Sequence, residues 1–337
     1  MNIRKNKLSI ILFLCISIFA LELKSAYGWG FWAHKRINRM AVFTLPPEMI
    51  GFFRTHIEYV TENSVNPDKR RYAVPDEYPR HFIDIDYYGE YPFENLPREW
   101  DAAVEKFTED TLLKYGVIPW HIDNVMRWLT SAFEAQDEER ILRLATDLGH
   151  YIGDAHVPLH TTLNYNGQYT NQRGIHGFWE SRLPELFADE YNYFVGRATY
   201  IDDILGEAWN IVLDAHLKVD SVLKLERKLH NSFPEHRKYS YERRGQTTVR
   251  VYSEEYSRAY HDMMNGMVER QMRKTIRSIG DFWYTAWVNA GQPNLSILKG
   301  RELSEEERER IEEERDAIRR GVPYGRPHPN TGTEAIE

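Results

Sequence analysis

Cysteine is almost absent from this chain: Cys15 is the only one among 337 residues. A single cysteine cannot form an intrachain disulfide, and a chain of this length can bury a sufficient core without one. If the first 28 residues are removed, as argued below, no thiolate ligand is left. A metal site would then use His, Asp, Glu and backbone groups, a donor set that suits zinc.

A net positive charge is also absent, since 51 Asp and Glu outnumber 43 Lys and Arg and the formal net charge is -8. This balance argues against a basic nucleic-acid footprint and against tight, salt-sensitive binding to duplexes. The charge balance leaves open an enzyme that binds one or two phosphates through metal ions. The sequence also has neither a phosphate-binding P-loop nor a GxGxxG stretch.

Long apolar runs are missing except near the amino terminus. Arg4, Lys5 and Lys7 precede an uncharged apolar run from Leu8 to Leu21. That run is shorter than the roughly 20 residues a membrane span requires. Small residues, Ala26 and Gly28, follow just before Trp29, as at a signal-peptidase site. We expect residues 1–28 to be a secretory signal peptide and the mature protein to be periplasmic or extracellular.

No stretch alternates convincingly like a strand, whereas helical patterns dominate. Helices are predicted over residues 33–45, 47–60, 100–115, 119–135, 137–155, 203–231 and 251–290. The sequence therefore predicts an all-α protein with one mostly helical domain over residues 29–298. Residues 299–337 are expected to form a charged helix and a disordered tail. Residues 232–248 are expected to be a polar loop, and Trp120, Trp128, Trp283 and Trp287 to lie in the core.

The stretch GHYIGDAHVPLH, residues 149–160, concentrates metal-binding side chains at a helix end. His150 and Asp154 are four residues apart and so share one helical face. Pro158 ends the helix, and His160 follows. A buried, hydrogen-bonded polar pair would look similar. His156 lies off the shared face, and we expect it to support the helix end rather than to be a ligand.

Two further stretches supply similar side chains. HGFWE, residues 176–180, places His176 and Glu180 four apart. HFIDID, residues 81–86, follows NPDKRR, residues 66–71, and combines His81 with several carboxylates. The candidates are Asp68, Asp76, Asp84 and Asp86. Arg71 is suited to hold a phosphate bidentately.

The predicted new amino terminus is a fourth candidate. After cleavage, the free amino group and the carbonyl oxygen of Trp29 would be able to chelate one metal in a five-membered ring. His34 follows five positions later, where a helix is expected to begin.

Taken together, these residues resemble the zinc-dependent phospholipase C and single-strand nuclease (S-one/P-one) superfamily. The shared pattern is Trp29, His34, Asp68, His81-Phe82, His150, Asp154, His160, His176 and Glu180. The resemblance implies a helical fold and three zinc ions per chain. One zinc would be held by Asp68, His81, His150 and Asp154. A second would be held by Trp29, His34 and the bridging Asp154. The third would be held by His160, His176 and Glu180.

The resemblance also implies roles in cleaving a phosphodiester. Asp68, Arg71 and Asp154 would be catalytic, Phe82 would stack on a base, and Asp84 would hydrogen-bond to its edge. Single-stranded nucleic acid or nucleotides are the favoured substrates. A phospholipase C acting on phospholipid is the alternative, favoured by Glu180 and by the short interval between His160 and His176. A non-catalytic secreted zinc-binding protein is a second alternative, and no protein partner is indicated.

Overall fold

The computed structural model describes residues 30–244 and 247–298. These residues are mostly helical, and the sheet that they form is a two-stranded hairpin. The predicted all-α class is therefore confirmed. The expectations for residues 1–28, for Trp29 and for the segment 299–337 lie outside the described residues.

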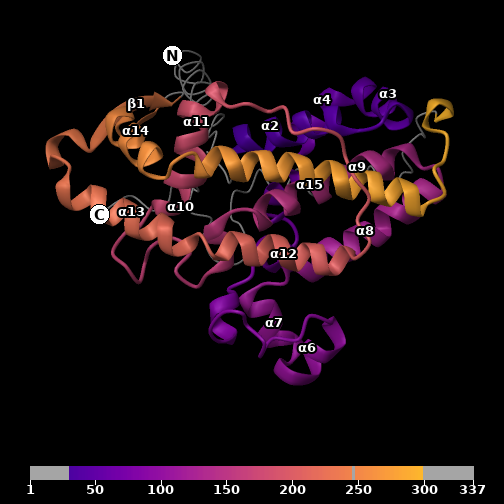
Figure 1. Ribbon diagram of the computed structural model, residues 1–337, viewed down its shortest axis with the longest axis horizontal. Helices are drawn as coiled ribbons and strands as arrows, with labels where there is room; N and C mark the ends of the chain where they lie inside the picture. Colours follow the sequence, from indigo (N-terminus) through magenta and orange to yellow (C-terminus); the bar gives the residue numbers. More distant parts are fainter. Residues whose placement is uncertain (1–29, 245–246, 299–337) are drawn as a thin grey trace, which may run out of the picture.

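Helix α9 (Glu138–Ala155) is central to the fold because most of its length is buried. Asp137 caps its first turn by accepting a hydrogen bond from the backbone nitrogen of Arg140 at 3.2 Å. Ile141, Leu148 and Ile152 form the expected apolar stripe and are fully buried. The helix packs against α2 (Phe31–Ala41), α4 (Ile57–Asn63), α8 (Ile118–Glu134), α12 (Ile204–His216) and α15 (Met267–Asn289). Figure 1 shows α15 running lengthwise across this bundle.

Helices α2 and α9 approach each other very closely at Gly149. A Cβ atom at this position would lie 2.0 Å from Oδ1 of Asn38 on α2, so no larger residue fits without a shift. One helical turn before Asn38, the ring of His34 stacks on that of His150, with centroids 4.0 Å apart. The glycine therefore sets the spacing that brings histidines from two helices together.

The remaining elements surround this bundle. In chain order they are η1 (Val42–Thr44), α3 (Pro47–Thr55), α5 (Asn66–Arg70), η2 (Pro75–His81), η3 (Ile85–Tyr88), α6 (Trp100–Phe107), α7 (Glu109–Tyr115), η4 (Pro158–Thr161), α10 (Ile175–Gly177), η5 (Phe178–Arg182), α11 (Leu183–Phe187), η6 (Ala188–Glu190), α13 (Val219–Ser232), η7 (Glu235–Arg237), β1 (Tyr239–Arg244), β2 (Thr247–Tyr252), α14 (Glu254–Met263) and η8 (Leu295–Ile297). No helix in the described ranges has the length and apolarity needed to cross a membrane.

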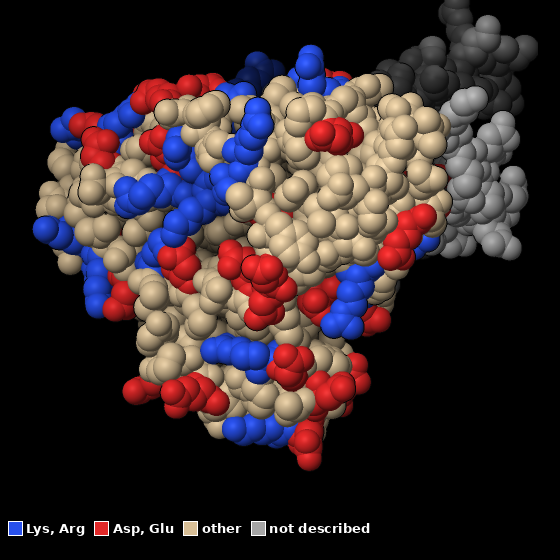
Figure 2. Space-filling model, turned by 45° about the vertical axis from the view of Figure 1, so that its right-hand side comes forward, with Lys and Arg blue, Asp and Glu red and all other residues tan. Residues whose placement is uncertain are grey.

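Helices α6 and α7 form a lobe that projects from the bundle at the bottom of Figure 1. Residues 89–115, which include this lobe, carry seven acidic and three basic side chains. The same lobe lies at the bottom of Figure 2, where Asp and Glu predominate. Its charge disfavours the docking of an anionic substrate there.

Several predicted helices are wrong in extent because the chain bends inside them. Residues 100–115 form two helices that meet at Thr108, which has a positive φ of 69°. The predicted helix 251–290 breaks at Asn265 and Gly266, which also have positive φ. Residues 47–60 and 203–231 are likewise divided, at His56 and near Leu217. Hydrophobic periodicity continues across such breaks, and so it did not reveal them.

The predicted loop over residues 232–248 is also partly wrong. Strands β1 and β2 pair antiparallel, with Tyr239 opposite Tyr252 and Ser240 opposite Val251. The alternating tyrosines and β-branched residues of this segment suit a strand. Of the four tryptophans expected in the core, Trp120, Trp283 and Trp287 are buried, but Trp128 is 48% exposed.

Candidate metal centre

Three groups of buried side chains in the described residues have the composition and spacing of metal sites. They are His34, His150 and Asp154; Asp68, His81 and His150; and His160, His176 and Glu180. In each group, one potential ligand atom per residue lies within 4.8 Å of the others. The structure thus brings together all the predicted metal ligands that it describes. These buried groups could hold metal ions.

The group around His81 is the most crowded. Nδ1 of His81 lies 2.8 Å from Oδ2 of Asp154 and 3.1 Å from Nε2 of His150. Oδ1 of Asp68 is 3.8 Å from each of these two nitrogens. Ligand atoms on one tetrahedral zinc are roughly 3.3 Å apart, as bonds of about 2.0–2.2 Å require. The observed separations of 2.8–3.8 Å bracket that distance.

The hydrogen bonds behind these ligands leave the inward-facing nitrogen available. Nδ1 of His150 donates to the backbone oxygen of Ser64 at 2.8 Å, so Nε2 is the nitrogen that can hold either a proton or a metal. That nitrogen faces the same point as the carboxylate oxygens of Asp68 and Asp154. Several lone pairs that meet in a buried space repel one another unless a cation or proton lies between them.

Asp154 connects this group with a second one. Its Oδ2 lies near His81 and His150, whereas its Oδ1 lies 3.2 Å from Nε2 of His34. Both ring nitrogens of the fully buried His34 lack a well-formed hydrogen bond within the described residues. Such a nitrogen costs about 1–3 kcal/mol, a cost that metal ligation would remove. The position of Trp29, the other expected ligand here, lies outside the described residues.

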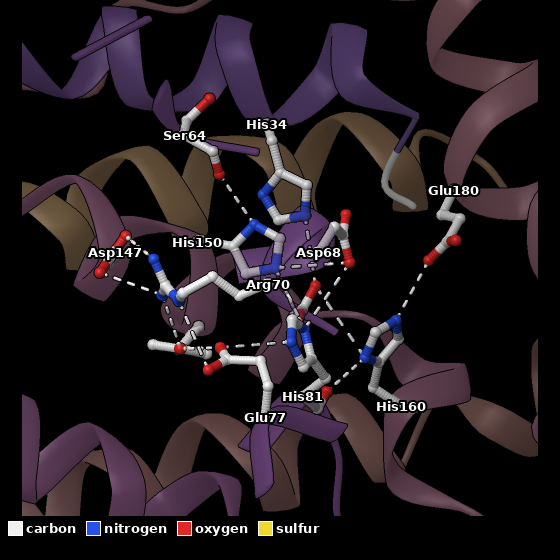
Figure 3. Close-up of polar contacts among 12 residues, drawn as sticks. His34, Ser64, Asp68, Arg70, Glu77, His81, Asp147, His150, His160 and Glu180 are labelled. Carbon is white, nitrogen blue, oxygen red and sulfur yellow. Dashed lines mark hydrogen bonds and ion pairs between the residues drawn. The ribbon is translucent and has the colours of Figure 1, made fainter. Parts of the chain in front are cut away.

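His160 and Glu180 of the third group lie on the opposite side of His150 from Asp147 (Figure 3). Oε2 of Glu180 is 2.8 Å from Nε2 of His176 and 3.3 Å from Nε2 of His160. Nδ1 of His160 donates to the backbone oxygen of His81 at 2.5 Å, which again leaves Nε2 facing the group. The turn that carries Glu180 is a π-helix, a rare form that is frequent at functional sites.

The electrostatics of these groups favour a positive charge at their centre. Burial by itself lowers the pKa of His150, but the carboxylates of Asp154 and Asp68 outweigh it and raise the pKa to about 9. Burial likewise opposes ionisation of Asp154, yet His150 and His160 hold its pKa well below the usual range. The pKa of His34 is lowered, first by burial and then by repulsion from His150. The carboxylate of Asp154 thus remains charged and attracts a cation.

The residues expected to bind substrate are all buried. Arg71 packs with its guanidinium 5.8 Å from the ring centre of Tyr78, and Phe82 packs against the same ring at 4.9 Å. Phe82 and Asp84 are 3% and 2% exposed. Stacking of Phe82 on a base therefore requires the ring to become accessible, and the substrate-binding roles of these residues stay predictions.

A network of ion pairs beside the centre did not emerge from the sequence. Arg70 binds Asp147 with its two terminal nitrogens at 3.0–3.1 Å and reaches Glu77 at 3.4 Å. Glu77 also accepts hydrogen bonds from Arg80 and from the hydroxyl of Tyr151. Its Oε1 lies 3.7 Å from Nε2 of His81, on the side of the ring away from Asp154. The spacing of Glu77 and His81, four residues apart, was the available signal.

His156 belongs to none of the three groups among the described residues. Its Nε2 lies 3.1 Å from the hydroxyl of Ser278 on α15, and its backbone oxygen accepts a hydrogen bond from Gln271. Burial lowers the pKa of His156 to about 3, so the ring is neutral. It joins the end of α9 to α15.

No model of a known protein family matches this chain, and no curated protein matches it.

Proposed function

We propose that the protein is a zinc-dependent phosphodiesterase that holds three zinc ions per chain. The observation that carries the proposal is the position of Asp154, whose two oxygens face two different histidine groups, at 3.2 Å from His34 and 2.8 Å from His81. A carboxylate that bridges two metals about 3.5–4 Å apart is the arrangement found in two-metal phosphoryl-transfer sites. The resemblance in sequence to the phospholipase C and single-strand nuclease superfamily supports the same assignment.

The ligand sets follow from the three groups. Asp68, His81, His150 and Asp154 would hold one zinc. His34 and Asp154, with the terminal amino group and carbonyl of Trp29, would hold the second. His160, His176 and Glu180 would hold the third. When bound, these ions would supply Lewis acidity toward phosphoryl oxygens and would make water acidic enough to act at neutral pH.

The chain's own residues position the reaction. His150 and His160 are locked in one tautomer by backbone oxygens, so their inward nitrogens need no reorganisation before they bind. Asp68 lies at the edge of its group, with Oδ1 3.8 Å from two histidine nitrogens. That position suits it to accept a proton from attacking water. Arg71 would stabilise charge on the phosphoryl oxygens if its side chain turned toward the bound phosphate.

Single-stranded nucleic acid or nucleotides are the proposed substrates, and phospholipid is the second candidate. The adjacency of Phe82, a stacking residue, to the ligand His81 favours nucleic acid. Glu180 in the third group and the short segment from His160 to His176 favour phospholipid. Export from the cytoplasm through a signal peptide over residues 1–28 remains part of the proposal, because the second zinc requires a free amino group at Trp29.

One experiment separates these substrates. Zinc-loaded protein that begins at Trp29 should hydrolyse bis-nitrophenyl phosphate, and it should cleave single-stranded DNA, RNA or 3′-nucleotides faster than phosphatidylcholine. Metal analysis should find about three zinc ions per chain. Activity on lipid alone would reverse the choice of substrate. A protein that binds zinc but hydrolyses none of these esters would be a non-catalytic zinc-binding protein.

A further inference from the structure

A cavity of about 420 Å³ adjoins the metal centre, and none of the roles proposed above uses it. It lies between the segment 70–80, helix α8 and helix α9, and Glu77 forms part of its wall. Glu77 separates the cavity from His81, whose Nε2 lies 3.7 Å from the carboxylate. The volume falls within the range of small-molecule sites, about 300–1,000 Å³.

The wall of this cavity has an excess of positive charge. Its charged side chains are Arg70, Arg80, Arg140, Arg143, Glu77 and Asp147. The two carboxylates are already occupied, since Arg70 binds both and Arg80 binds Glu77. Within residues 30–244 and 247–298, the guanidinium groups of Arg140 and Arg143 form no ion pair and no hydrogen bond. Two arginines therefore remain available to an anion.

The arrangement of these two arginines suits one ligand group. Arg140 and Arg143 are three residues apart on α9, so their side chains leave the helix on the same face. Both are half-buried rather than fully solvated. The planar guanidinium group binds phosphate or carboxylate bidentately, and it does so more strongly where water is partly excluded.

A flat aromatic surface lies beside these arginines. Trp128, on α8, lines the cavity and is 48% exposed, so its indole ring is partly accessible. The ring of His121 meets it edge-on with centroids 6.0 Å apart. Burial, followed by the charge of Arg80, lowers the pKa of His121 to about 3, so this neighbour is neutral. An exposed indole next to guanidinium groups offers both a stacking surface and an anion site.

We propose that this cavity binds a nucleoside monophosphate, with the phosphate on Arg140 and Arg143 and the base stacked on Trp128. The arginines and the tryptophan of the cavity indicate a ligand with an anionic group and a planar ring. The choice of a nucleotide among such compounds rests on the proposed function. The site is distinct from the metal centre, because its wall contains none of the residues of the three histidine groups.

Binding of adenosine 5′-monophosphate to the zinc-loaded chain, measured by titration calorimetry at physiological salt, tests the proposal. The Arg140→Gln/Arg143→Gln double variant should bind it at least about tenfold more weakly than the wild type, because two charge-assisted contacts are lost. Arg127→Gln is the matched control, since Arg127 precedes Trp128 but is 74% exposed and pairs with Asp123 outside the cavity. Its affinity should equal that of the wild type. The metal centre is intact in all of these proteins, so the difference between them reports on the cavity.

The ring contact is tested separately. Trp128→Leu should weaken binding of adenosine 5′-monophosphate about tenfold while leaving the weaker binding of inorganic phosphate unchanged. Equal affinity of the double variant and the wild type, or no binding by the wild type at millimolar ligand, would overturn the proposal. Should the double variant fail to fold, as judged by circular dichroism, Arg140→Gln alone decides. Since binding is measured without hydrolysis, an inactive protein that binds the nucleotide would refute only the proposed function.

Discussion

Two buried polar clusters lie side by side on helix α9, and their polar side chains find different kinds of partners. On one face, Asp147 and Tyr151 join Arg70 and Glu77 in a network of ion pairs and hydrogen bonds. On the adjacent face, His150 and Asp154 join other histidines and Asp68. In Figure 3 the first cluster lies to the left of His150 and the second surrounds it. Asp147 and Tyr151 are four residues apart, and so are His150 and Asp154.

The difference lies in what each cluster contains. In the Arg70 network, every acceptor finds a donor from within the chain: Glu77 alone receives hydrogen bonds from Arg80 and Tyr151 and an ion pair from Arg70. In the histidine cluster, the potential metal ligands face one another, with Nδ1 of His81 3.1 Å from Nε2 of His150. A self-sufficient cluster stabilises the fold, whereas one built of histidines and carboxylates could hold a cation from outside.

The largest effect is expected for Asp154, which belongs to the histidine cluster. Asp154→Ala should lose about two zinc ions per chain and at least about 10³-fold in kcat/KM, because the residue faces two metal groups. Asp147→Ala, one cluster away on the same helix, is the matched control and should keep its metal. Metal analysis of the two purified variants measures the zinc content, and hydrolysis of bis-nitrophenyl phosphate measures kcat/KM. Equal zinc contents would contradict the division of α9 into two faces.

Glu77, in the Arg70 network, should affect stability rather than metal content. Burial opposes the ionisation of Glu77, but Arg70, His81 and Tyr151 hold its pKa well below the usual range, so it is charged at neutral pH. Glu77→Gln leaves Arg70 and Arg80 without a full partner and should destabilise the fold by about 3–5 kcal/mol. Zinc content should stay within one ion of the wild type. Urea unfolding with zinc present measures the loss of stability, and metal analysis measures the zinc content. The exposed Glu134→Gln on α8 is the control.

The smallest effect concerns pH. Burial first, then Arg80, lowers the pKa of His121 to about 3, whereas the unfolded chain binds this proton near 6.5. The unfolded state therefore holds more protons between these values, and stability falls as the pH decreases from 6.5 toward 3. Each such group contributes a slope of up to about 1.4 kcal/mol per pH unit. In His121→Gln the mean slope between pH 6.5 and 5 should be shallower by about 1 kcal/mol per pH unit, because the unfolded histidine is only half protonated at pH 6.5. Unfolding free energies measured across that range test it, and identical slopes would be inconsistent with a buried neutral ring.

The local parts of the candidate site were predictable from the sequence. The pairs His150–Asp154 and His176–Glu180 depend only on helical spacing, and the structure keeps each pair together. The choice among four carboxylates near His81 was not available from spacing, because it depends on how the turn after α5 meets α9. Asp68 belongs to the group of His81 and His150. Asp86 instead accepts hydrogen bonds from Thr162 and Leu163, in the segment after His160.

The parts that could not be predicted depend on contacts between distant segments. The backbone oxygen of Ser64 fixes His150 across 86 residues, and a carbonyl carries no signature in sequence. The network around Arg70 was not predicted, since nothing local marks a lysine- and arginine-rich turn as buried. Breaks at Thr108 and Asn265 require positive φ at residues that seldom adopt it. Tertiary packing selects this backbone conformation at both residues.

His81 belongs to two of the metal groups in different ways. Its imidazole faces Asp68 and His150, while its backbone oxygen orients His160 of the third group. A movement of this one residue, caused by loading or emptying its own group, would shift the acceptor that holds His160. The ions would then load as a cooperative set, each changing the affinity of the next, rather than as three independent equilibria.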